Sequence, residues 1–390
     1  MKLGLITFLT VSGWAGWAAW AGCAGCVAGC SSSAKGAAGG DGGGGDGGGA
    51  GDDAGPGADA AGTDAGEGGA GDDASQGTTP TWTAFASRGS DSRWGVPLAY
   101  AGKEGAFLAF GGSQYPTVIA APGTFSLSMS TGQWTQLTDV TPPAPRYCGC
   151  ATYLPDRDQV LLIGGQDGAP MTPAAFTLDL ATSAWTAVSG AVPAGAIGCM
   201  TAYMPGIGKA VVFGGLSSTA MTSDTWLYDP VAATFTKAAP ATHPPARADG
   251  IAAYDPGDGG RMLLFAGTSN EVDATGHMND LWAFDGTSWT QLQPSGGPPS
   301  VRRVPAGGFD AQRRRWVVFG GTDETADRGD LWLLDVASLT WTQLDAAGTP
   351  PARGFASAGY DPGTDSYVVV GGLAQPSDQT LSDGWKLELR

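Results

Sequence analysis

WVVFGG at residues 316–321, DLWLLD at 330–335 and TWTQL at 340–344 form the stretch that decides the fold. Apolar side chains alternate along each run, and a pair of glycines closes the first run. Alternation with a period of two predicts β-strands, and a glycine-rich break predicts a turn. The same succession of strands, glycine pair and loop returns along the chain, so the sequence indicates a repeat protein built from short strands.

Two landmarks give the period of the repeat. The second glycines of the pairs lie 50 to 54 residues apart, and Ala266 replaces the first glycine in one copy. An aromatic residue followed by threonine opens a further strand in each unit. A period near 50 with these elements predicts a propeller or a solenoid. The second glycines are Gly112, Gly165, Gly215, Gly267, Gly321 and Gly372, and the aromatics are Trp82, Trp134, Trp185, Phe235, Trp289 and Trp341.

The two ends of the repeat region predict a closed ring. The last unit ends with a third strand at 385–389, and the first unit is preceded by an extra fourth strand at 81–85. If the early strand completes the last unit, six four-stranded blades result and no long sheet edge is left at the seam. The expected fold is therefore all-β, with the recurring aromatics packed between neighbouring sheets.

The glycine pairs, the spaced aromatics and the strand pattern resemble the kelch repeat over about 310 residues. The resemblance implies a six-bladed kelch-type β-propeller, similar to the central domain of galactose oxidase, at residues 80–390. We expect a binding or interaction module rather than an enzyme, and no residue is assigned a catalytic role. The alternative is a carbohydrate-active enzyme, since some bacterial kelch propellers epimerise sialic acid, although that family's active residues have no counterparts that can be assigned here. A structural surface protein is a third reading.

The N-terminus predicts export. Met1–Lys2 is basic and residues 3–29 carry no charge, which is typical of a secretory signal. Val27-Ala28-Gly29-Cys30 resembles a bacterial lipobox, in which Cys30 is lipidated after removal of residues 1–29. Cys23 is a weaker candidate, and an uncleaved membrane span is the alternative. We expect an exported lipoprotein, anchored to the membrane in the periplasm, at the outer membrane or at the cell surface.

Residues 30–79 consist largely of Gly, Ala and Asp and bury too little apolar surface to fold. We therefore expect a disordered linker between the signal peptide and the propeller. The formal net charge of the chain is −17, and the propeller region is itself acidic. An acidic surface repels phosphate backbones, which makes nucleic acid an unfavourable partner. Contact with the membrane is expected through the N-terminal lipid only.

The loops between the second and third strands of each unit vary most in length and composition. Variable loops on a rigid scaffold are where binding is usually found, so a protein or a glycan is expected on this face. Because the linker leads into a fourth strand, it should enter from the opposite face. The variable loops are predicted at 113–122, 166–173, 216–223, 268–279, 322–329 and 373–382.

Five arginines recur seven residues before the aromatic that ends each first strand; the third unit has Ala196 instead. If they begin the inner strands, they should surround the mouth of the central channel and bind a carboxylate, sialic acid or sulfate. The alternative is a structural role, with pairing to Asp224, Asp280, Asp330 or Asp383 two residues before a third-strand tryptophan. The five are Arg93, Arg146, Arg247, Arg302 and Arg353.

Acidic residues on the loops of two neighbouring units suggest a Ca²⁺ site or, as the alternative, a solvated rim. They are Glu271, Asp273, Asp323, Glu324 and Asp327. The chain has two histidines, His243 and His277, which do not form a copper or iron motif together with the neighbouring residues. We therefore expect no cofactor apart from this candidate cation.

Three cysteines lie in the propeller region, and Cys199 aligns with the residue between Cys148 and Cys150 of the preceding unit. Alternation places Cys148 and Cys150 on one side of their strand and Cys199 on the other side of its own, and these sides face each other if the ring is wound in the required direction. A disulfide between Cys150 and Cys199 would suit an oxidising compartment. Three buried thiols acting as small apolar residues are the alternative.

Overall fold

The computed structural model describes residues 79–390 apart from 90, 116–118, 168–172, 196, 271–273, 324 and 390. The signal peptide, Cys30 and almost all of the linker lie outside the described residues. The described chain contains one short 3-10 helix, η1 (Ala274–Gly276), and is otherwise built from strands. Within this part of the chain, no helix has the length and apolar character needed to cross a bilayer.

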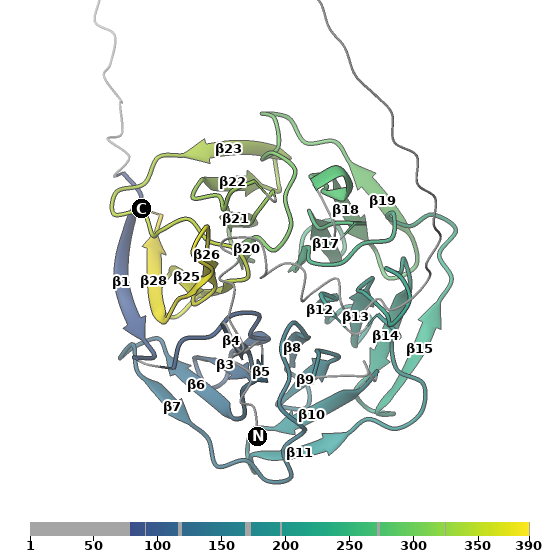
Figure 1. Cartoon of the computed structure of the whole chain (residues 1–390). Coiled ribbons are helices and arrows are strands. Elements are labelled where there is room, and N and C mark those ends of the chain that lie inside the picture. Colours follow the sequence, from purple (N-terminus) through teal and green to yellow (C-terminus); the bar gives the residue numbers. More distant parts are fainter. Residues whose placement is uncertain are drawn as a thin grey trace, which may run out of the picture. The chain divides into compact units, whose positions relative to one another are not determined.

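The described strands form six four-stranded antiparallel sheets, which confirms the predicted number of blades (Figure 1). Blade 1 contains β2 (Leu98–Ala101), β3 (Ala106–Phe110), β6 (Thr124–Ser128) and β7 (Trp134–Gln136). Blade 2 contains β8 (Cys150–Leu154), β9 (Gln159–Ile163), β10 (Ala175–Asp179) and β11 (Ala184–Ala187). Blade 3 contains β12 (Met200–Met204), β13 (Lys209–Phe213), β14 (Thr225–Asp229) and β15 (Thr234–Ala238).

The remaining blades repeat this order, except that the last one takes its outer strand from the start of the described chain. Blade 4 contains β16 (Ile251–Asp255), β17 (Arg261–Phe265), β18 (Leu281–Phe284) and β19 (Trp289–Leu292). Blade 5 contains β20 (Ala306–Asp310), β21 (Arg315–Phe319), β22 (Leu331–Asp335) and β23 (Thr340–Leu344). Blade 6 contains β24 (Ser357–Asp361), β25 (Ser366–Val370), β28 (Asp383–Glu388) and β1 (Thr81–Ser87).

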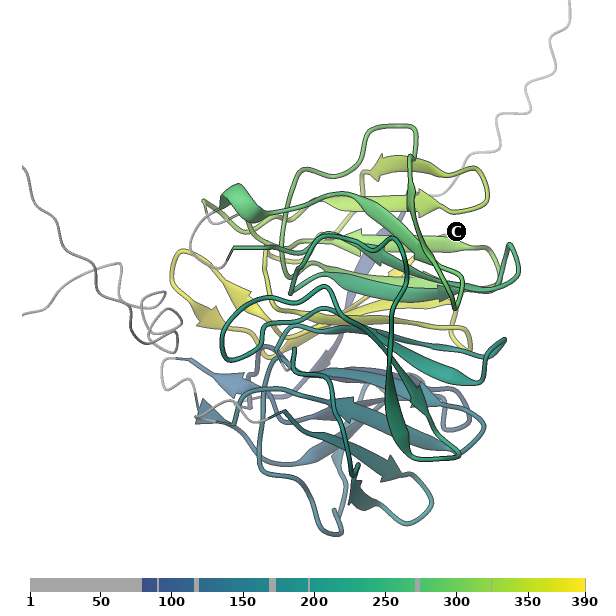
Figure 2. The same cartoon turned by 90° about the vertical axis from the view of Figure 1, so that its right-hand side faces the viewer.

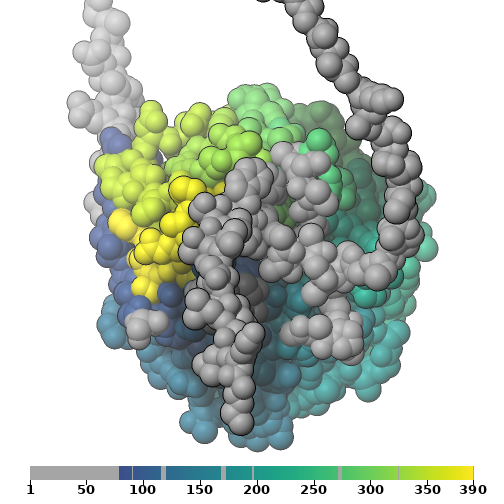
Figure 3. Space-filling model, in the orientation of Figure 1, coloured from purple at the N-terminus to yellow at the C-terminus, as the bar shows by residue number. Residues whose placement is uncertain are grey.

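The closure predicted from the two ends is present. Strand β1 pairs antiparallel with β28 from Thr81 opposite Glu388 to Ser87 opposite Asp383. The inner strands contact one another in a closed circle, and β2 of blade 1 meets β24 of blade 6. In Figure 3 the purple start of the described chain accordingly lies against the yellow C-terminal strands. The ring is thus joined by antiparallel pairing at the seam, which leaves β28 paired on both of its edges.

The propeller has two faces, one at each end of its central channel, and different connections between strands lie on each of them. The loops between second and third strands lie on one face, called here the loop face, and two of them form the hairpins β4 (Ser113–Gln114)–β5 (Ile119–Ala120) and β26 (Leu373–Ala374)–β27 (Gln379–Thr380). Turns between first and second and between third and fourth strands lie on the opposite, turn face. Figure 1 views the loop face, and Figure 2 shows the C-terminus on the opposite side.

The start of the described chain lies on the turn face, as predicted. Thr81 pairs with Glu388, at the end of β28 that is remote from the loop at 373–382. Ser87, at the other end of β1, pairs with Asp383 beside that loop. The chain therefore enters the propeller on the side opposite the variable loops.

The core between blades follows one repeated contact. A tryptophan in the fourth strand of one blade packs on the phenylalanine that ends the second strand of the preceding blade. Ring centroids are 4.9 Å apart for Trp185 and Phe110, and 4.9 Å apart for Trp341 and Phe265. Such aromatic pairs contribute area burial and about 0.5–1.5 kcal/mol of specific attraction. The recurring aromatics are therefore packing residues, as the sequence suggested.

The seam between the first and last segments uses the same contact. Trp82 of β1 is 3 % exposed, and its ring centroid lies 5.3 Å from that of Phe319 in blade 5. We expect Trp82→Ala to lower the free energy of unfolding by about 3–5 kcal/mol, because it empties a core position of the closing strand. Denaturant unfolding of the full chain would measure this change. Val231→Ala, at a side chain that is 78 % exposed, is the control and should change it little.

Candidate functional site

A closed ring of backbone hydrogen bonds surrounds the channel axis on the loop face. One residue from the segment before each inner strand donates its N–H to the carbonyl of the equivalent residue in the preceding blade. The N···O distances run from 2.7 to 3.3 Å, and the last bond joins Gly95 N–H to the carbonyl of Phe355. We call these six residues the axial ring: Gly95, Cys148, Gly198, Asp249, Val304 and Phe355.

All six residues of the axial ring have a left-handed backbone conformation. Their φ angles lie between 47° for Val304 and 63° for Gly198. For residues other than glycine this conformation costs about 1–2 kcal/mol, and most for a β-branched side chain such as Val304. The axial ring holds its four non-glycine residues in this conformation because each N–H and each carbonyl has its hydrogen-bond partner in a neighbouring blade.

The central channel opens into a cavity on each side. The loop-side cavity has a volume of ≈ 210 Å³ and is lined by the axial ring and the first residues of the inner strands. Asp249 is the one carboxylate among its described lining residues. Its side chain is 3 % exposed and lies 3.4 Å from the guanidinium of Arg303, which is itself 2 % exposed. This buried pair has no signature in the sequence, because neither residue recurs in the other units.

The five predicted arginines do not line this cavity. Each arginine lies two residues before the axial-ring residue of its blade and four or five residues before the first residue of the inner strand. The expectation that the arginines begin the inner strands and surround the mouth of the channel is therefore wrong. Their relative exposures are 6 % or less. The left-handed residue that follows turns the chain toward the axis and leaves the arginine over its own blade.

Each arginine joins two blades. Its guanidinium donates to the first carbonyl of the glycine pair in its own blade, as from Arg302 Nη1 to Gly320 at 2.9 Å. Its own carbonyl accepts the second glycine N–H of the preceding blade, as from Gly267 to Arg302 at 3.1 Å. Glycine is required because a Cβ at Gly111 would lie 2.1 Å from the carbonyl oxygen of Arg146. The arginines and glycine pairs thus form one structural unit.

Three arginines form the aspartate pairs that the sequence offered as the alternative. Arg247 pairs with Asp280, Arg302 with Asp330 and Arg353 with Asp383, each through two N–O contacts of 2.6–2.8 Å. Each aspartate also accepts the indole N–H of the tryptophan two residues later. Bidentate geometry with buried partners favours the structural role. The ligand-binding role stays a prediction that this geometry does not support.

In blades 1, 2 and 3 the buried arginine or its partner differs from this pattern. Arg93 and Arg146 lie over the rings of Phe125 and Phe176, at 4.7 and 5.0 Å from the centroids, where the other blades have tryptophan. Arg93 also contacts Asp91 at 2.8 Å. In blade 3, Ala196 lies outside the described residues, and Asp224 contacts Lys237 at 2.8 Å rather than an arginine. The buried cation is therefore balanced by a carboxylate or an aromatic face.

The candidate Ca²⁺ residues are only partly described, since Glu271, Asp273 and Glu324 lie outside the described residues. Asp323 contacts Arg328 and caps the turn at Thr325, whereas Asp327 accepts the N–H of Gln375 from blade 6 at 2.7 Å. Burial, together with the charge of the neighbouring Asp378, raises the pKa of Asp327 to about 6, although the N–H of Gln375 opposes this shift. Among described residues, no group of three suitable side chains forms a metal site. Calcium binding stays a prediction.

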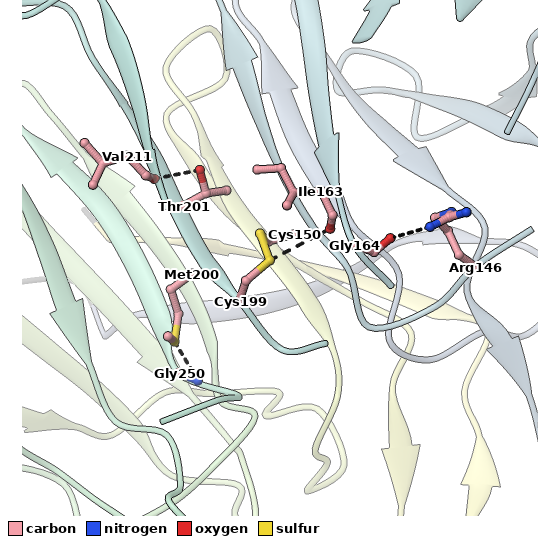
Figure 4. Close-up of a disulfide and its surroundings, with 9 residues drawn as sticks. All are labelled: Arg146, Cys150, Ile163, Gly164, Cys199, Met200, Thr201, Val211 and Gly250. Atoms are coloured by element: carbon pink, nitrogen blue, oxygen red, sulfur yellow. Dashed lines mark hydrogen bonds between the residues drawn. A yellow bond between two sulfur atoms is a disulfide. The ribbon is translucent and has the colours of Figure 1, made fainter. Parts of the chain in front are cut away.

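The structure joins Cys150 and Cys199 in a disulfide between blades 2 and 3, with Cα atoms 5.6 Å apart (Figure 4). Cys199 Sγ lies 3.8 Å from the carbonyl oxygen of Ile163, and Arg146 reaches Gly164 one residue further along that chain. Cys148, in the axial ring, is a buried free thiol. Cys150 at the start of β8 and Cys199 directly before β12 therefore face each other and form the pairing that the alignment of the units indicated.

The protein is a six-bladed propeller in which most blades carry a buried arginine and a glycine pair. The family model of the KLHDC2/KLHL20/DRC7 Kelch-repeats domain matches residues 95–304 and 208–390. The chain therefore belongs to the kelch-repeat family, as the sequence resemblance implied.

Similar proteins share the repeat rather than their full length. A Kelch repeat-containing protein of Arthroderma benhamiae is 31 % identical over 27 % of this chain and 18 % of its own length. Dynein regulatory complex subunit 7 of Chlamydomonas reinhardtii is 34 % identical over 30 % of this chain and 10 % of its own length. Rab9 effector protein with kelch motifs of Danio rerio is 34 % identical over 21 % of this chain and 24 % of its own length. The chain thus spans less than a quarter of these relatives.

The buried pairs give a stability prediction. We expect Asp330→Asn to lower the free energy of unfolding by about 3 kcal/mol, because Arg302 is fully buried and would lose its counter-charge. The matched control is Asp224→Asn, whose partner Lys237 has a side chain that is 52 % exposed, so a loss below about 1 kcal/mol is expected. Equal losses in the two variants would contradict the structural role of the buried pair. Denaturant unfolding at neutral pH measures both.

The same variant has a predictable pH dependence. Burial alone would raise the pKa of Asp330, but the hydrogen bonds and charge of Arg302 outweigh it and lower this pKa below the ordinary value. A lowered pKa in the folded state adds stability above the unfolded-state pKa of about 3.9, and this contribution is lost as pH falls through the folded-state pKa. The stability difference between the wild type and Asp330→Asn should therefore shrink below about pH 4.

Proposed function

We propose that this protein is an exported, lipid-tethered binding module that holds a protein partner on its loop face. The observation that carries this proposal is the separation of the two faces, with variable loops on one and the chain entry on the other. Kelch propellers typically act as protein-interaction modules, and one relative is named as an effector of Rab9. A glycan is the other class of partner that such a loop face suits.

Two observations support the extracytoplasmic location in this proposal. The stretch Val27-Ala28-Gly29-Cys30 follows an uncharged segment, as in bacterial lipoproteins. The disulfide between Cys150 and Cys199 suits an oxidising compartment, because cytosolic thiols are usually kept reduced. Entry of the chain on the turn face would direct the loop face away from the tether.

The tether is tested on the full chain in a Gram-negative bacterial host. We expect the wild-type chain in the membrane fraction with a lipid mass on its N-terminal peptide, and Cys30→Ser should lose that lipid because serine cannot form the thioether. Cys23→Ser is the matched control and should stay lipidated. Membrane fractionation and mass spectrometry give the readout. A lipidated Cys30→Ser variant, or loss of the lipid in Cys23→Ser, would show that Cys30 is not the site.

The loop face is tested with a photo-crosslinking amino acid placed on either side of the propeller. Thr219 and Ser377 are exposed positions on the loop face, whereas Val231 and Thr287 are exposed positions on turn-face connections. In the native cells, we expect protease-sensitive adducts from the first pair and none from the second, because only the first pair lies at the proposed interface. Adducts that are removed by periodate instead would indicate a glycan. Equal adducts from both faces would refute the assignment of the loop face.

A further inference from the structure

The turn-side cavity of the channel, with a volume of ≈ 420 Å³, is twice the size of the loop-side cavity. One aromatic residue from the same register of each inner strand lines it. These residues are Tyr100, Tyr153, Tyr203, Tyr254, Phe309 and Tyr360. Pockets of about 300–1,000 Å³ that combine apolar walls with a few placed polar groups are typical small-molecule sites. These aromatics also pack against the apolar cores between blades, so each presents one part of its ring to a neighbouring blade and another part to the open space of the cavity.

The polar groups of this cavity are uncharged, since no charged side chain is among its described lining residues. Several of the tyrosine hydroxyls donate to carboxylates behind the wall. Tyr153 donates to Asp158 and Tyr360 to Asp365, both at 2.7 Å, and Tyr100 donates to Asp361. Because their protons are engaged, these hydroxyl oxygens are left as acceptors for a ligand.

Two of the carboxylates that accept from the tyrosine hydroxyls have cationic partners in the protein. Lys103 contacts Asp158, and Arg313 contacts Asp365 and Asp310. Burial raises the pKa of Tyr100, and the charge of Asp361 raises it further, so the hydroxyl stays neutral at physiological pH. A neutral wall favours a neutral ligand, because an ion would lose its hydration without gaining a counter-charge.

One donor in the wall has no partner among the described residues. Trp316 is 1 % exposed and lines the cavity, and no acceptor among the described residues takes its indole N–H. Its Nε1 would lie 3.0 Å from a Cβ at position 307, but this position is glycine. The equivalent inner-strand residues of the other blades are Leu98, Ala151, Thr201, Ala252 and Ala358, all with a Cβ. Unlike the indole N–H groups of Trp82, Trp94, Trp226 and Trp341, which are enclosed without a partner, the N–H of Trp316 is not enclosed and lies at the cavity, where the acceptor of a ligand could reach it.

We propose that the turn-side cavity binds a neutral pyranose, as a mono- or disaccharide. The aromatic wall would contact the apolar C–H face of the sugar ring, the tyrosine oxygens would accept from its hydroxyls, and Trp316 would donate to one hydroxyl or ring oxygen. The hydroxyl groups of a sugar can donate to the tyrosine oxygens, and a sugar oxygen can accept from the indole N–H of Trp316. The site is separate from the loop face and does not depend on the partner proposed there.

The test is calorimetric titration of the full chain, kept in a detergent without sugar head groups. The probes are glucose, galactose, N-acetylglucosamine and maltose, with sialic acid and choline as charged probes. At least one neutral sugar should bind at millimolar concentration or below, and more tightly than either charged probe. The absence of binding by every neutral probe, or tighter binding by a charged probe, would overturn the proposal.

Variants place the binding at this cavity. Trp316→Phe keeps the ring and removes the donor, so affinity should fall about five-fold, as expected for one hydrogen bond. Tyr254→Ala removes part of the wall and should weaken binding more than ten-fold. Trp226→Phe is the matched control, since its buried indole N–H also lacks a partner but does not line the cavity. Thermal unfolding identifies any variant that fails to fold, and a folded Trp316→Phe variant with unchanged affinity would overturn the assignment.

Discussion

The closed ring of six backbone hydrogen bonds around the axis is the constraint on which the propeller depends. A blade buries its faces only against its neighbours, so every blade needs two neighbours at fixed distance and angle. The axial ring sets both, because each donor and each acceptor comes from a different blade and the last bond returns to the first. Four of its residues adopt the left-handed conformation without being glycine, which the closed geometry stabilises against their local preference.

The arginines extend this constraint outward from the axis. Each anchors the segment before an inner strand to the carbonyl of the glycine pair in its own blade, while its carbonyl holds the preceding blade. Buried ion pairs of this kind add specificity more than net stability, because desolvation offsets much of the attraction. In two blades the guanidinium lies over a phenylalanine ring and contacts a carboxylate from another position, Asp91 or Asp167. The arrangement therefore tolerates a change of partner but keeps the guanidinium.

This construction leaves the two ends of the channel chemically different. On the loop face, the axial ring narrows the channel, and variable loops surround it, which suits a large partner. On the turn face, the inner strands end in aromatic residues and short turns, which leave the wider cavity. A rigid ring between the two ends allows each side to vary without disturbing the other, because the axial ring and the apolar cores between blades hold the blades together independently of the loops and turns.

The sequence by itself determined the strands, the six blades, the closure by the segment around Trp82 and the face on which the chain enters. These follow from alternation, from a period near 50 and from chain direction, which are local or additive properties. The pairing of Cys150 with Cys199 was one of two alternatives left open by the alignment of units, and the structure supplies it.

Only the tertiary structure decided where the arginines lie. Their direction depends on the left-handed residue two positions later, and the residue types at that position, from Gly95 to Val304 and Phe355, share no property that a sequence pattern could reveal. The same holds for Asp249 with Arg303, which occur once each, and for Trp316, whose indole reaches the channel because a different strand has glycine at 307. Contacts between blades, rather than any local preference, fix these side chains.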